Sequence, residues 1–300
     1  MPSTRDIRRR IKSVKNTAQI TKAMQMVAAA KMRKAQQAAL VGRPYADLLN
    51  AILAEAGPRI VSFQHPLMAA RPVARRALIV VSSDRGLCGG LNSNLFREVA
   101  RQDKNATFVY VTAGRKAAQF VARTKRKLAG EFPYKDAPTF AEARAISKFA
   151  QDLFLKGEAD AVDILFTNFI STLVQQPKLL PFLPVGKIHA VTAGVNAPPQ
   201  ELSTAGVRTD IFEFEPDEKT VLSELLPHSL NFQVHQILLE AKASEQSARM
   251  VAMKNATDTA EDMLERLTLT SNRARQGRIT EEIIEIVSGA ESLKNQDQDT

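Results

Sequence analysis

The residues whose spacing comes nearest to a reactive site form a glycine-rich turn at residues 83–92, Ser-Asp-Arg-Gly-Leu-Cys-Gly-Gly-Leu-Asn. The turn follows an apolar run and precedes a helical pattern, and backbone N–H groups at such a junction often bind nucleotide phosphates. Its glycines, Gly86, Gly89 and Gly90, match neither GxGxxG nor GxxxxGK[ST]. Three interpretations stay open: a tight structural turn, which the spacing favours, a docking point that exposes Asp84 and Arg85, and a nucleotide site.

The remaining residues with catalytic or ligating side chains do not form a recognisable constellation. The four histidines, His65, His189, His228 and His235, are scattered, and Cys88 is the single cysteine. There is no HExxH or CxxC spacing, and one cysteine cannot form an intrachain disulfide. We therefore expect no autonomous active site, no metal and no cofactor. No run of about 18 apolar residues occurs, so we also expect no membrane insertion.

The positive charge of the chain is concentrated at one end. The net charge is +9, yet residues 1–43 hold 11 Lys or Arg and one acid, Asp6, which leaves the remainder near neutral. The run from Arg5 to Lys15 could bind nucleic acid or an acidic protein surface, or could simply be solvated. It carries no interleaved aromatic side chains that would stack on bases.

Both ends of the chain predict unusually long helices. Residues 4–41 contain no Gly or Pro, and would form a helix of roughly 57 Å. Small and apolar residues recur there at alternating steps of three and four: Ile7, Ile11, Val14, Ala18, Thr21, Gln25, Ala28, Met32, Ala35 and Ala39. This spacing is typical of a helical stripe that packs on one partner helix.

Residues 228–276 also lack Gly and Pro, and the same spacing runs through Leu230, Val234, Ile237, Ala241, Ser244, Ala248 and Val251. We expect Asn255 to interrupt this stripe, and Pro227 to lie in the first helical turn or at a kink. If the two helices pair, both join the middle segment at the same end. The pair must then be antiparallel, with both termini at the far tip.

The middle of the chain alternates strand and helix patterns. Buried strands are predicted at 77–82, 107–112 and 161–168, with helices at 91–102, 116–127 and 140–156. This order is typical of a doubly wound, largely parallel, Rossmann-like α/β sheet. Later strand patterns at 172–180, 188–191 and 211–214 predict antiparallel additions, and residues 194–206 a surface loop.

The fold class is therefore α/β, with a long antiparallel two-helix coiled coil beside a central α/β domain. The predicted bounds are 1–58 for the first coiled-coil helix, 75–216 for the central domain and 217–290 for the second helix, with a disordered tail at 293–300. Near the end of the second helix, apolar residues surround much of the circumference. These are Ile279, Ile283, Ile284, Ile286 and Val287, and exposed apolar surface of this kind indicates an interaction site.

Four stretches in this order resemble the gamma subunits of bacterial, chloroplast and mitochondrial F-type ATP synthases. Residues 20–34 resemble that family's first helix, and the turn at 83–92 its central signature. Residues 243–258 resemble its second helix, and 279–292 its C-terminal signature. The likeness covers nearly the whole chain.

The resemblance implies a non-catalytic central stalk, or rotor, inside a ring of three alpha–beta pairs, with one gamma chain per ring. It implies that proton flow turns a membrane ring of c subunits, to which the foot of the stalk is attached together with the epsilon subunit. It also implies a peripheral location on the cytoplasmic face of a bacterial inner membrane. The alternative from the charge pattern is a nucleic-acid-binding protein with a basic coiled-coil arm.

The resemblance also implies roles for single residues. Met24, Lys31 and Arg33 correspond to the helix segment near the beta loops. Arg275, Gln276 and Thr280 correspond to the contact with a beta catch loop, and we add Ile283 and Ile286 of the apolar tip. Phe214 and Glu215 correspond to the foot near the membrane ring. Pro227 and Gly277 depart from helix continuity, which predicts a kink near the base and a softer tip. The redox insertion of chloroplast members, with its paired cysteines, is missing.

Overall fold

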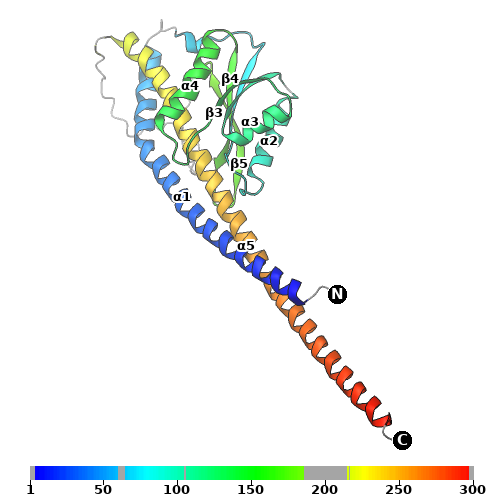
Figure 1. Ribbon diagram of the computed structural model, residues 1–300. Coiled ribbons are helices and arrows are strands. Elements are labelled where there is room, and N and C mark those ends of the chain that lie inside the picture. Colours follow the sequence, from blue (N-terminus) through cyan, green and yellow to red (C-terminus); the bar gives the residue numbers. More distant parts are fainter. Residues whose placement is uncertain (1–3, 60–64, 105, 186–214, 216, 297–300) are drawn as a thin grey trace. The chain divides into compact units, whose positions relative to one another are not determined.

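The computed structural model describes residues 4–59, 65–104, 106–185, 215 and 217–296. The chain divides into two compact units, and the long helices α1 (Thr4–Arg59) and α5 (Glu218–Gln296) contribute to both (Figure 1). One unit combines residues 1–26 with residues 252–300, and the other comprises residues 27–251. We call the first the two-helix unit and the second the sheet unit.

A five-stranded sheet forms the centre of the sheet unit. Its strands are β1 (Arg76–Val81), β2 (Phe108–Ala113), β3 (Leu128–Phe132), β4 (Ala161–Phe169) and β5 (Gln175–Leu183). They lie in the order β3-β2-β1-β4-β5, and all neighbours are parallel except β4 and β5. The predicted α/β class, with a largely parallel sheet and an added antiparallel strand, is confirmed.

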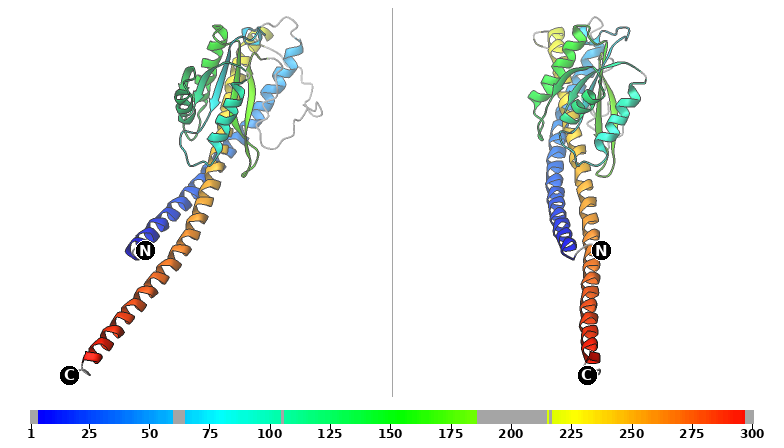
Figure 2. Two further views of the ribbon diagram at one scale, coloured as in Figure 1. Left: turned by 90° about the vertical axis from the view of Figure 1, so that its right-hand side faces the viewer. Right: turned by 45° about the vertical axis from the view of Figure 1, so that its right-hand side comes forward.

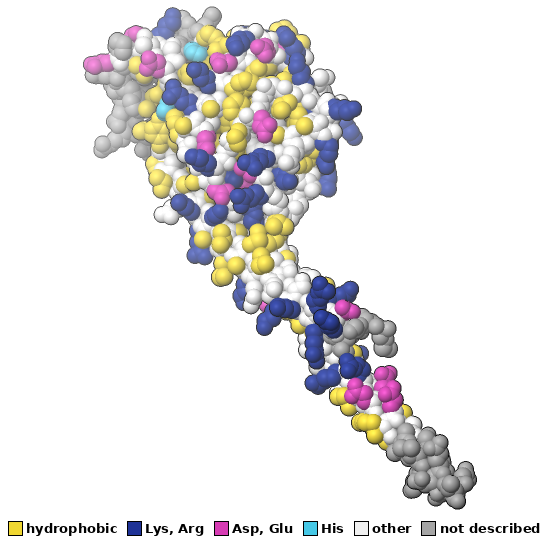
Figure 3. All heavy atoms as spheres, viewed as in Figure 1, with side chains coloured by type: hydrophobic (Ala, Val, Ile, Leu, Met, Phe, Trp, Pro, Cys, Tyr) yellow, Lys and Arg dark blue, Asp and Glu magenta, His cyan; other side chains and the backbone are white. Residues whose placement is uncertain are grey.

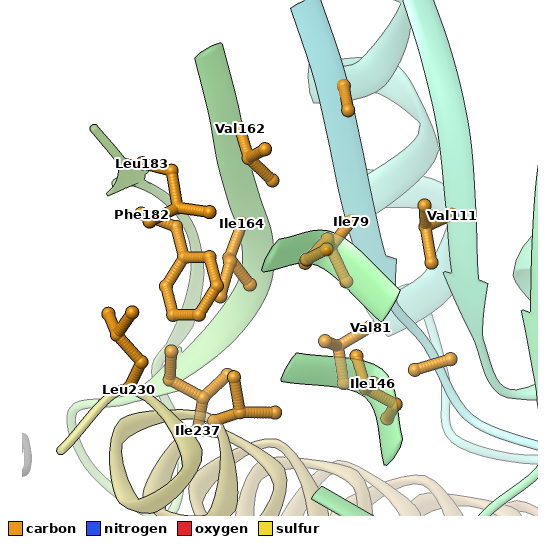
Figure 4. Close-up of a cluster of buried hydrophobic side chains, with 14 of the residues drawn as sticks. Ile79, Val81, Val111, Ile146, Val162, Ile164, Phe182, Leu183, Leu230 and Ile237 are labelled. Carbon is orange, nitrogen blue, oxygen red and sulfur yellow. The ribbon is translucent and has the colours of Figure 1, made fainter. Parts of the chain in front are cut away.

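Helices cover both faces of this sheet (Figure 2). On one face α2 (Leu91–Gln102) and α3 (Arg115–Arg123) pack against Leu78 and Val80 of β1. On the other face α4 (Phe140–Leu155) and α5 enclose a second cluster, in which Ile79, Ile146 and Ile237 meet (Figure 4). Alternate residues of β1 thus enter different cores, as the period of two requires. A short 3-10 helix, η1 (Pro66–Met68), adds Leu67 to the second core.

Local sequence signals determine both ends of α4. Thr139 caps the helix through a reciprocal capping box, in which its Oγ1 accepts from the Glu142 N–H and the Glu142 carboxylate accepts from the Thr139 N–H. Gly157 follows the last turn with φ +72°, a left-handed conformation that glycine adopts without steric cost. The prediction of 140–156 was therefore accurate.

One strand was missed. β3 has the sequence Leu-Ala-Gly-Glu-Phe and lies at an edge of the sheet, so it shows neither an apolar run nor regular alternation. The predicted second helix accordingly ends at Arg123 rather than at residue 127, because the chain must turn into β3. The predicted strands at 188–191 and 211–214 and the loop at 194–206 lie outside the described residues.

Within the two-helix unit, residues 4–26 of α1 run antiparallel to the last part of α5 (Figures 1 and 2). Ile7, Ala18 and Thr21 of the predicted stripe are buried. Thr21 and Thr257 join the helices through a hydrogen bond of 2.7 Å between their hydroxyl oxygens. Thr257 is thus a polar residue on the buried face of α5. Asn255 is exposed, so the prediction that it interrupts this face was wrong.

The long helices extend beyond the stretches at 4–41 and 228–276 that lack glycine and proline. α1 continues through Gly42 and Pro44 to Arg59, and α5 contains both Pro227 and Gly277. At Gly42 packing against α5 outweighs intrinsic propensity, whereas Gly277 lies on an exposed stretch, where a glycine weakens a helix without ending it. α5 also reaches Gln296, past residue 293, where the disordered tail was predicted to begin. Its last residues are helix formers and polar, and polarity alone does not end a helix. The domain bounds at 58, 75 and 217 stay predictions.

Candidate functional site

The glycine-rich turn connects β1 to α2 and is held by its own side chains. Ser83 Oγ donates to the Arg85 carbonyl oxygen at 2.8 Å and accepts from Asn92 Nδ2 at 2.7 Å. Asp84 Oδ1 accepts from the backbone N–H of Arg115 at 2.9 Å, which links the turn to the start of α3. The Asp84 carboxylate therefore helps to hold the turn against the first residue of α3.

Two residues of the turn adopt the left-handed backbone conformation, Leu87 with φ +64° and Gly89 with φ +58°. This conformation is strained for leucine, and the Leu87 side chain is 62% exposed. Gly90 is the N-cap residue of α2, and Gly86 has open space where a side chain would be. Cys88 is buried, within 3.4 Å of Asn92 Nδ2, so its thiol does not face solvent.

Arg249 of α5 anchors the turn from outside. One of its terminal nitrogens lies 3.3 Å from the Gly86 carbonyl oxygen and 3.5 Å from that of Arg85. The same guanidinium forms an ion pair of 2.8 Å with Glu245, one helical turn earlier. The turn is thus fastened to α5 through its carbonyl groups, as is typical of a tight structural turn.

A charge network with a buried centre continues from Glu245. Lys242 Nζ lies 2.9 Å from Glu245 Oε2 and 3.4 Å from Asp136 Oδ1, and it lies 4.8 Å from the centre of the Tyr134 ring. Asp136 also pairs with Lys31 of α1 at 2.6 Å. Together, Lys31, Asp136, Lys242, Glu245 and Arg249 form what we call the charge network. It joins α1, the β3–α4 connection, α5 and the turn.

The electrostatics of this network favour its charged form. The hydrogen bond from Lys31 lowers the pKa of Asp136, and Lys242 adds to that effect. Burial raises the pKa of Tyr134, as do the nearby carboxylates of Glu245 and Asp84. The Tyr134 phenol therefore stays neutral and donates to the Ser82 carbonyl oxygen at 2.9 Å, just before the turn.

The described histidines serve structural roles. His65 Nδ1 accepts from the Leu67 N–H and caps η1. His228 Nε2 lies 2.8 Å from the Tyr45 hydroxyl, and His235 Nε2 lies 3.3 Å from the Pro138 carbonyl oxygen. Burial lowers the pKa of His235. Among the described residues, no three His, Cys, Asp or Glu side chains gather in a way that could hold a metal ion.

The three contact residues proposed for α1 have different surroundings. Lys31 belongs to the charge network, whereas Arg33 is exposed and forms no ion pair within the described part of the chain. Met24 belongs to the two-helix unit and is half-buried. Lys and Arg side chains gather on that unit (Figure 3), and those of Arg8, Arg9, Arg10, Lys12 and Lys15 are exposed.

The C-terminal contact residues all lie on one exposed stretch of α5. Arg275, Gln276, Thr280, Ile283 and Ile286 are exposed, as is every other residue from 275 to 288. The end of α5 extends beyond the first residues of α1 within the two-helix unit (Figure 2). The apolar side chains of this stretch therefore have no helix of their own unit to pack on; Ile286 is 71% exposed.

Of the two residues predicted for the foot, Glu215 is exposed and Phe214 lies outside the described residues. The sequence analysis missed the buried pair Lys242 and Glu245, together with Tyr134 and the exposed Asp136 that contact Lys242. The spacing of Lys242, Glu245 and Arg249 at steps of three and four was a signal for ion pairs on one helix face. Nothing in the sequence pointed to Asp136, which is more than a hundred positions away from Lys242.

Comparisons with known proteins agree with one another. A family model described as ATP synthase matches residues 3–293. The ATP synthase gamma chain of Opitutus terrae is 50% identical over 294 residues, which cover 96% of this chain and 98% of that protein. The gamma chain of Pelotomaculum thermopropionicum is 43% identical over 297 residues, 98% of this chain and 100% of that protein.

Solved structures share the fold. A chain from the OSCP/F1/c-ring structure of the Euglena gracilis mitochondrial ATP synthase aligns with a TM-score of 0.66 and 17% identity, covering 97% of this chain and 94% of that chain. A chain from the rotor structure of the same enzyme aligns with a TM-score of 0.60 and 18% identity, covering 92% of this chain and 98% of that chain. The nucleic-acid alternative receives no support from these comparisons. This chain belongs to the ATP synthase gamma chain family.

Proposed function

We propose that this chain is the non-catalytic central stalk, or rotor, of a proton-translocating F-type ATP synthase. Its family membership supports the complex, and one structural observation supports the mechanical role. The C-terminal stretch of α5 from residue 275 to 288 is exposed throughout and carries Ile279, Ile283, Ile284, Ile286 and Val287. Such apolar surface is unfavourable in water and is expected to lie inside a partner.

The partner that fits is a ring of alternating alpha and beta subunits, with one stalk per three alpha–beta pairs. Inside such a ring, Arg275, Gln276 and Thr280 would meet a catch loop of a beta subunit, and Ile283 and Ile286 would run in an apolar bearing. Because the shaft is asymmetric, the three catalytic sites contact three different sides of it at any moment. As the shaft rotates, each site contacts each side in turn. A shaft can bias its partner's conformations only if it binds those conformations unequally.

The basic residues of α1 suit the acidic loops of the beta subunits. Arg33 supports this best, because its guanidinium is exposed and forms no ion pair among the described residues. The Lys31 ammonium already pairs with Asp136 at 2.6 Å, so a beta carboxylate would have to share it. We therefore expect Arg33 to contribute more to that contact than Lys31.

The foot of the stalk, with Glu215 and Phe214, would bind the membrane c ring together with the epsilon subunit. The solved structures that share this fold include a central stalk with its c-ring, a rotor and an F1/c-ring assembly, which is compatible with these partners. None of the described helices is both long enough and apolar enough to cross a bilayer. We propose peripheral attachment at the cytoplasmic face of a bacterial inner membrane.

Replacing Met24 by lysine tests the proposed contact of α1. The new ammonium group would lie at the beta loops and form an additional ionic contact, and proton pumping per ATP hydrolysed should fall. Inverted vesicles containing the whole complex, assayed for hydrolysis and for acidification together, measure this ratio. Met24→Gln alters polarity without charge and should keep coupling near the wild-type value. Unchanged coupling in Met24→Lys would exclude this contact.

A further inference from the structure

A pocket lies at the amino ends of β1, β2 and β3, beneath the last turns of α4. Its volume is about 410 Å³, and its apolar lining includes Ala77, Val109 and Phe149. Three cations, Arg75, Lys127 and Lys156, also line it. Pockets of this size and mixed character are typical of sites that bind a side chain or a small molecule.

The charges around the pocket favour an anion. Arg75, Lys127 and Lys156 form no ion pair within the described part of the chain, and all three are exposed. Arg123 and Lys125, which lie just before β3, are likewise exposed and unpaired among the described residues. Only two acids, Asp152 and Glu158, line the same pocket. Cations thus outnumber acids at this corner of the sheet.

The pocket adjoins an open sheet edge. β3 is an outer strand of the described sheet, and its burial pattern is mostly exposed. The Lys127 carbonyl oxygen accepts from the Tyr110 N–H of β2 at 2.8 Å. The peptide bond between Lys127 and Leu128 is trans, so its N–H points the opposite way, outward from the sheet. β3 therefore presents a backbone donor to an added strand.

The opposite edge of the described sheet offers fewer backbone donors. β5 contains Pro177 and Pro181, which have no N–H to donate. β3 contains no proline, and Pro133 comes only after its last residue. The two edges differ in the feature by which proteins commonly prevent unwanted strand addition.

The pocket lies beside the first residues of β3, the strand with the open edge. The register between β2 and β3 shifts between Tyr110 and Val111, and Lys127 and Ala129 both line the pocket. Phe149 of α4 packs on Phe132 at the other end of β3, with ring centroids 5.3 Å apart. Every second side chain of an added strand would point to the α4 side of the sheet, where Phe149 and the cations line the pocket.

We propose that β3 binds an extended, carboxylate-bearing segment of a partner protein, which adds a strand to the sheet. One of its acidic side chains enters the pocket and pairs with Lys127 and Lys156. Main-chain hydrogen bonds supply part of the affinity, and the pocket selects acidic over basic segments. This proposal does not depend on the rotor function.

A blocked heptapeptide of alternating valine and glutamate serves as the probe, titrated into the isotope-labelled full-length chain and followed by NMR. We expect saturable shifts of the amides of residues 128–132 and a Kd of about 1 mM or tighter, weakening with salt. The matching valine–lysine peptide should bind at least tenfold more weakly. Equal binding of both peptides, or no shift in β3, would overturn the proposal.

Variants locate the site. Lys127→Glu combined with Lys156→Glu should weaken binding of the glutamate peptide at least tenfold. Lys178→Glu, a single charge reversal at an exposed position of β5, should leave the Kd unchanged. Leu128→Pro removes the outward N–H and should also weaken binding. If free glutarate fills the pocket but the peptide leaves the β3 amides unmoved, the pocket binds a small anion only, and strand addition is wrong.

Discussion

Lys242 Nζ lies 2.9 Å from Glu245 Oε2, with the two side chains exposed by only 1% and 4%. Two charges removed from water to this extent stabilise the fold only if both stay paired, because each unpaired ion would keep its desolvation penalty. Here Asp136 and the Tyr134 ring complete the surroundings of Lys242, and Arg249 completes those of Glu245.

Replacing Lys242 by methionine should therefore destabilise the sheet unit. The variant keeps the stem of the side chain but leaves Glu245 buried with one cation instead of two. We expect the free energy of unfolding in urea to fall by about 3 kcal/mol, the lower end for a broken buried pair, because Arg249 remains. Lys254→Met, at an exposed position of the same helix, should change it by less than about 0.5 kcal/mol. A change below about 1 kcal/mol at Lys242 would contradict the role given to the network.

Asp136 makes stability depend on pH. Its pKa is lowered in the folded state, chiefly by the hydrogen bond from Lys31. The group therefore stabilises the fold above its unfolded pKa of about 3.9, and this contribution is lost as the pH falls through the lower folded pKa. The stability difference between the wild type and Asp136→Asn should be largest above about pH 5 and shrink towards pH 3. Urea titrations at several pH values measure it, and a pH-independent difference would show that the ion pairs contribute nothing.

Gly42 and Gly277 are both helical glycines, but their surroundings predict opposite responses to alanine. A Cβ atom at Gly42 would overlap the side-chain amide of Gln236, which is buried and lacks a hydrogen-bond partner in the described structure. At Gly277 nothing lies within 4 Å. Gly277→Ala should stabilise α5 by about 0.5–1 kcal/mol through helix propensity, whereas Gly42→Ala should lose that gain to overpacking.

Thermal and urea unfolding of the two variants provide the comparison. We expect Gly42→Ala to be at least about 1 kcal/mol less stable than Gly277→Ala. Adding Gln236→Ala to Gly42→Ala should restore part of the loss by removing the overlapping amide. Equal gains at both glycines would mean that the close packing of α1 on α5 at Gly42 is incorrect.

Arg249 should control the order of the glycine-rich turn. Without its guanidinium, the carbonyl groups of Arg85 and Gly86 lose their donor. In Arg249→Met we expect amide hydrogens of residues 84–90 to exchange about tenfold faster, which corresponds to about 1.4 kcal/mol of lost protection. Arg266→Met, at an exposed position, should leave their exchange unchanged. Unaltered exchange in Arg249→Met would show that the turn is rigid without α5.

The sequence predicted the elements that have strong local signals. β1 is an apolar run followed by glycines, α4 begins at a capping box, and the stripe through Ile7, Ala18 and Thr21 marks the packed face of α1. β3 was not predicted, because an edge strand buries few side chains and therefore needs no apolar run. The predicted helices at 1–58 and 217–290 already included Gly42, Pro44, Pro227 and Gly277, and the structure has all four inside α1 and α5.

The exposed candidate residues could be chosen from the sequence, but the charge network could not. Lys242 resembles a solvated lysine on a helix until Tyr134 and Asp136 are brought over it by the β3–α4 connection. Contacts between residues this far apart depend on the complete fold. Only the spacing of Lys242, Glu245 and Arg249 along one helix face indicated part of the charge network.

Reconstitution tests the central claim most directly. The purified chain is mixed with the cognate alpha and beta subunits, and ATP hydrolysis and complex size are followed together. If the chain is a rotor, it is inert alone and yields an active complex of one copy per three alpha–beta pairs. The same complex made with a chain truncated after Ala274 should be less stable, because the exposed stretch is gone. A chain that forms no complex, and instead hydrolyses nucleotide or binds RNA by itself, would contradict the account.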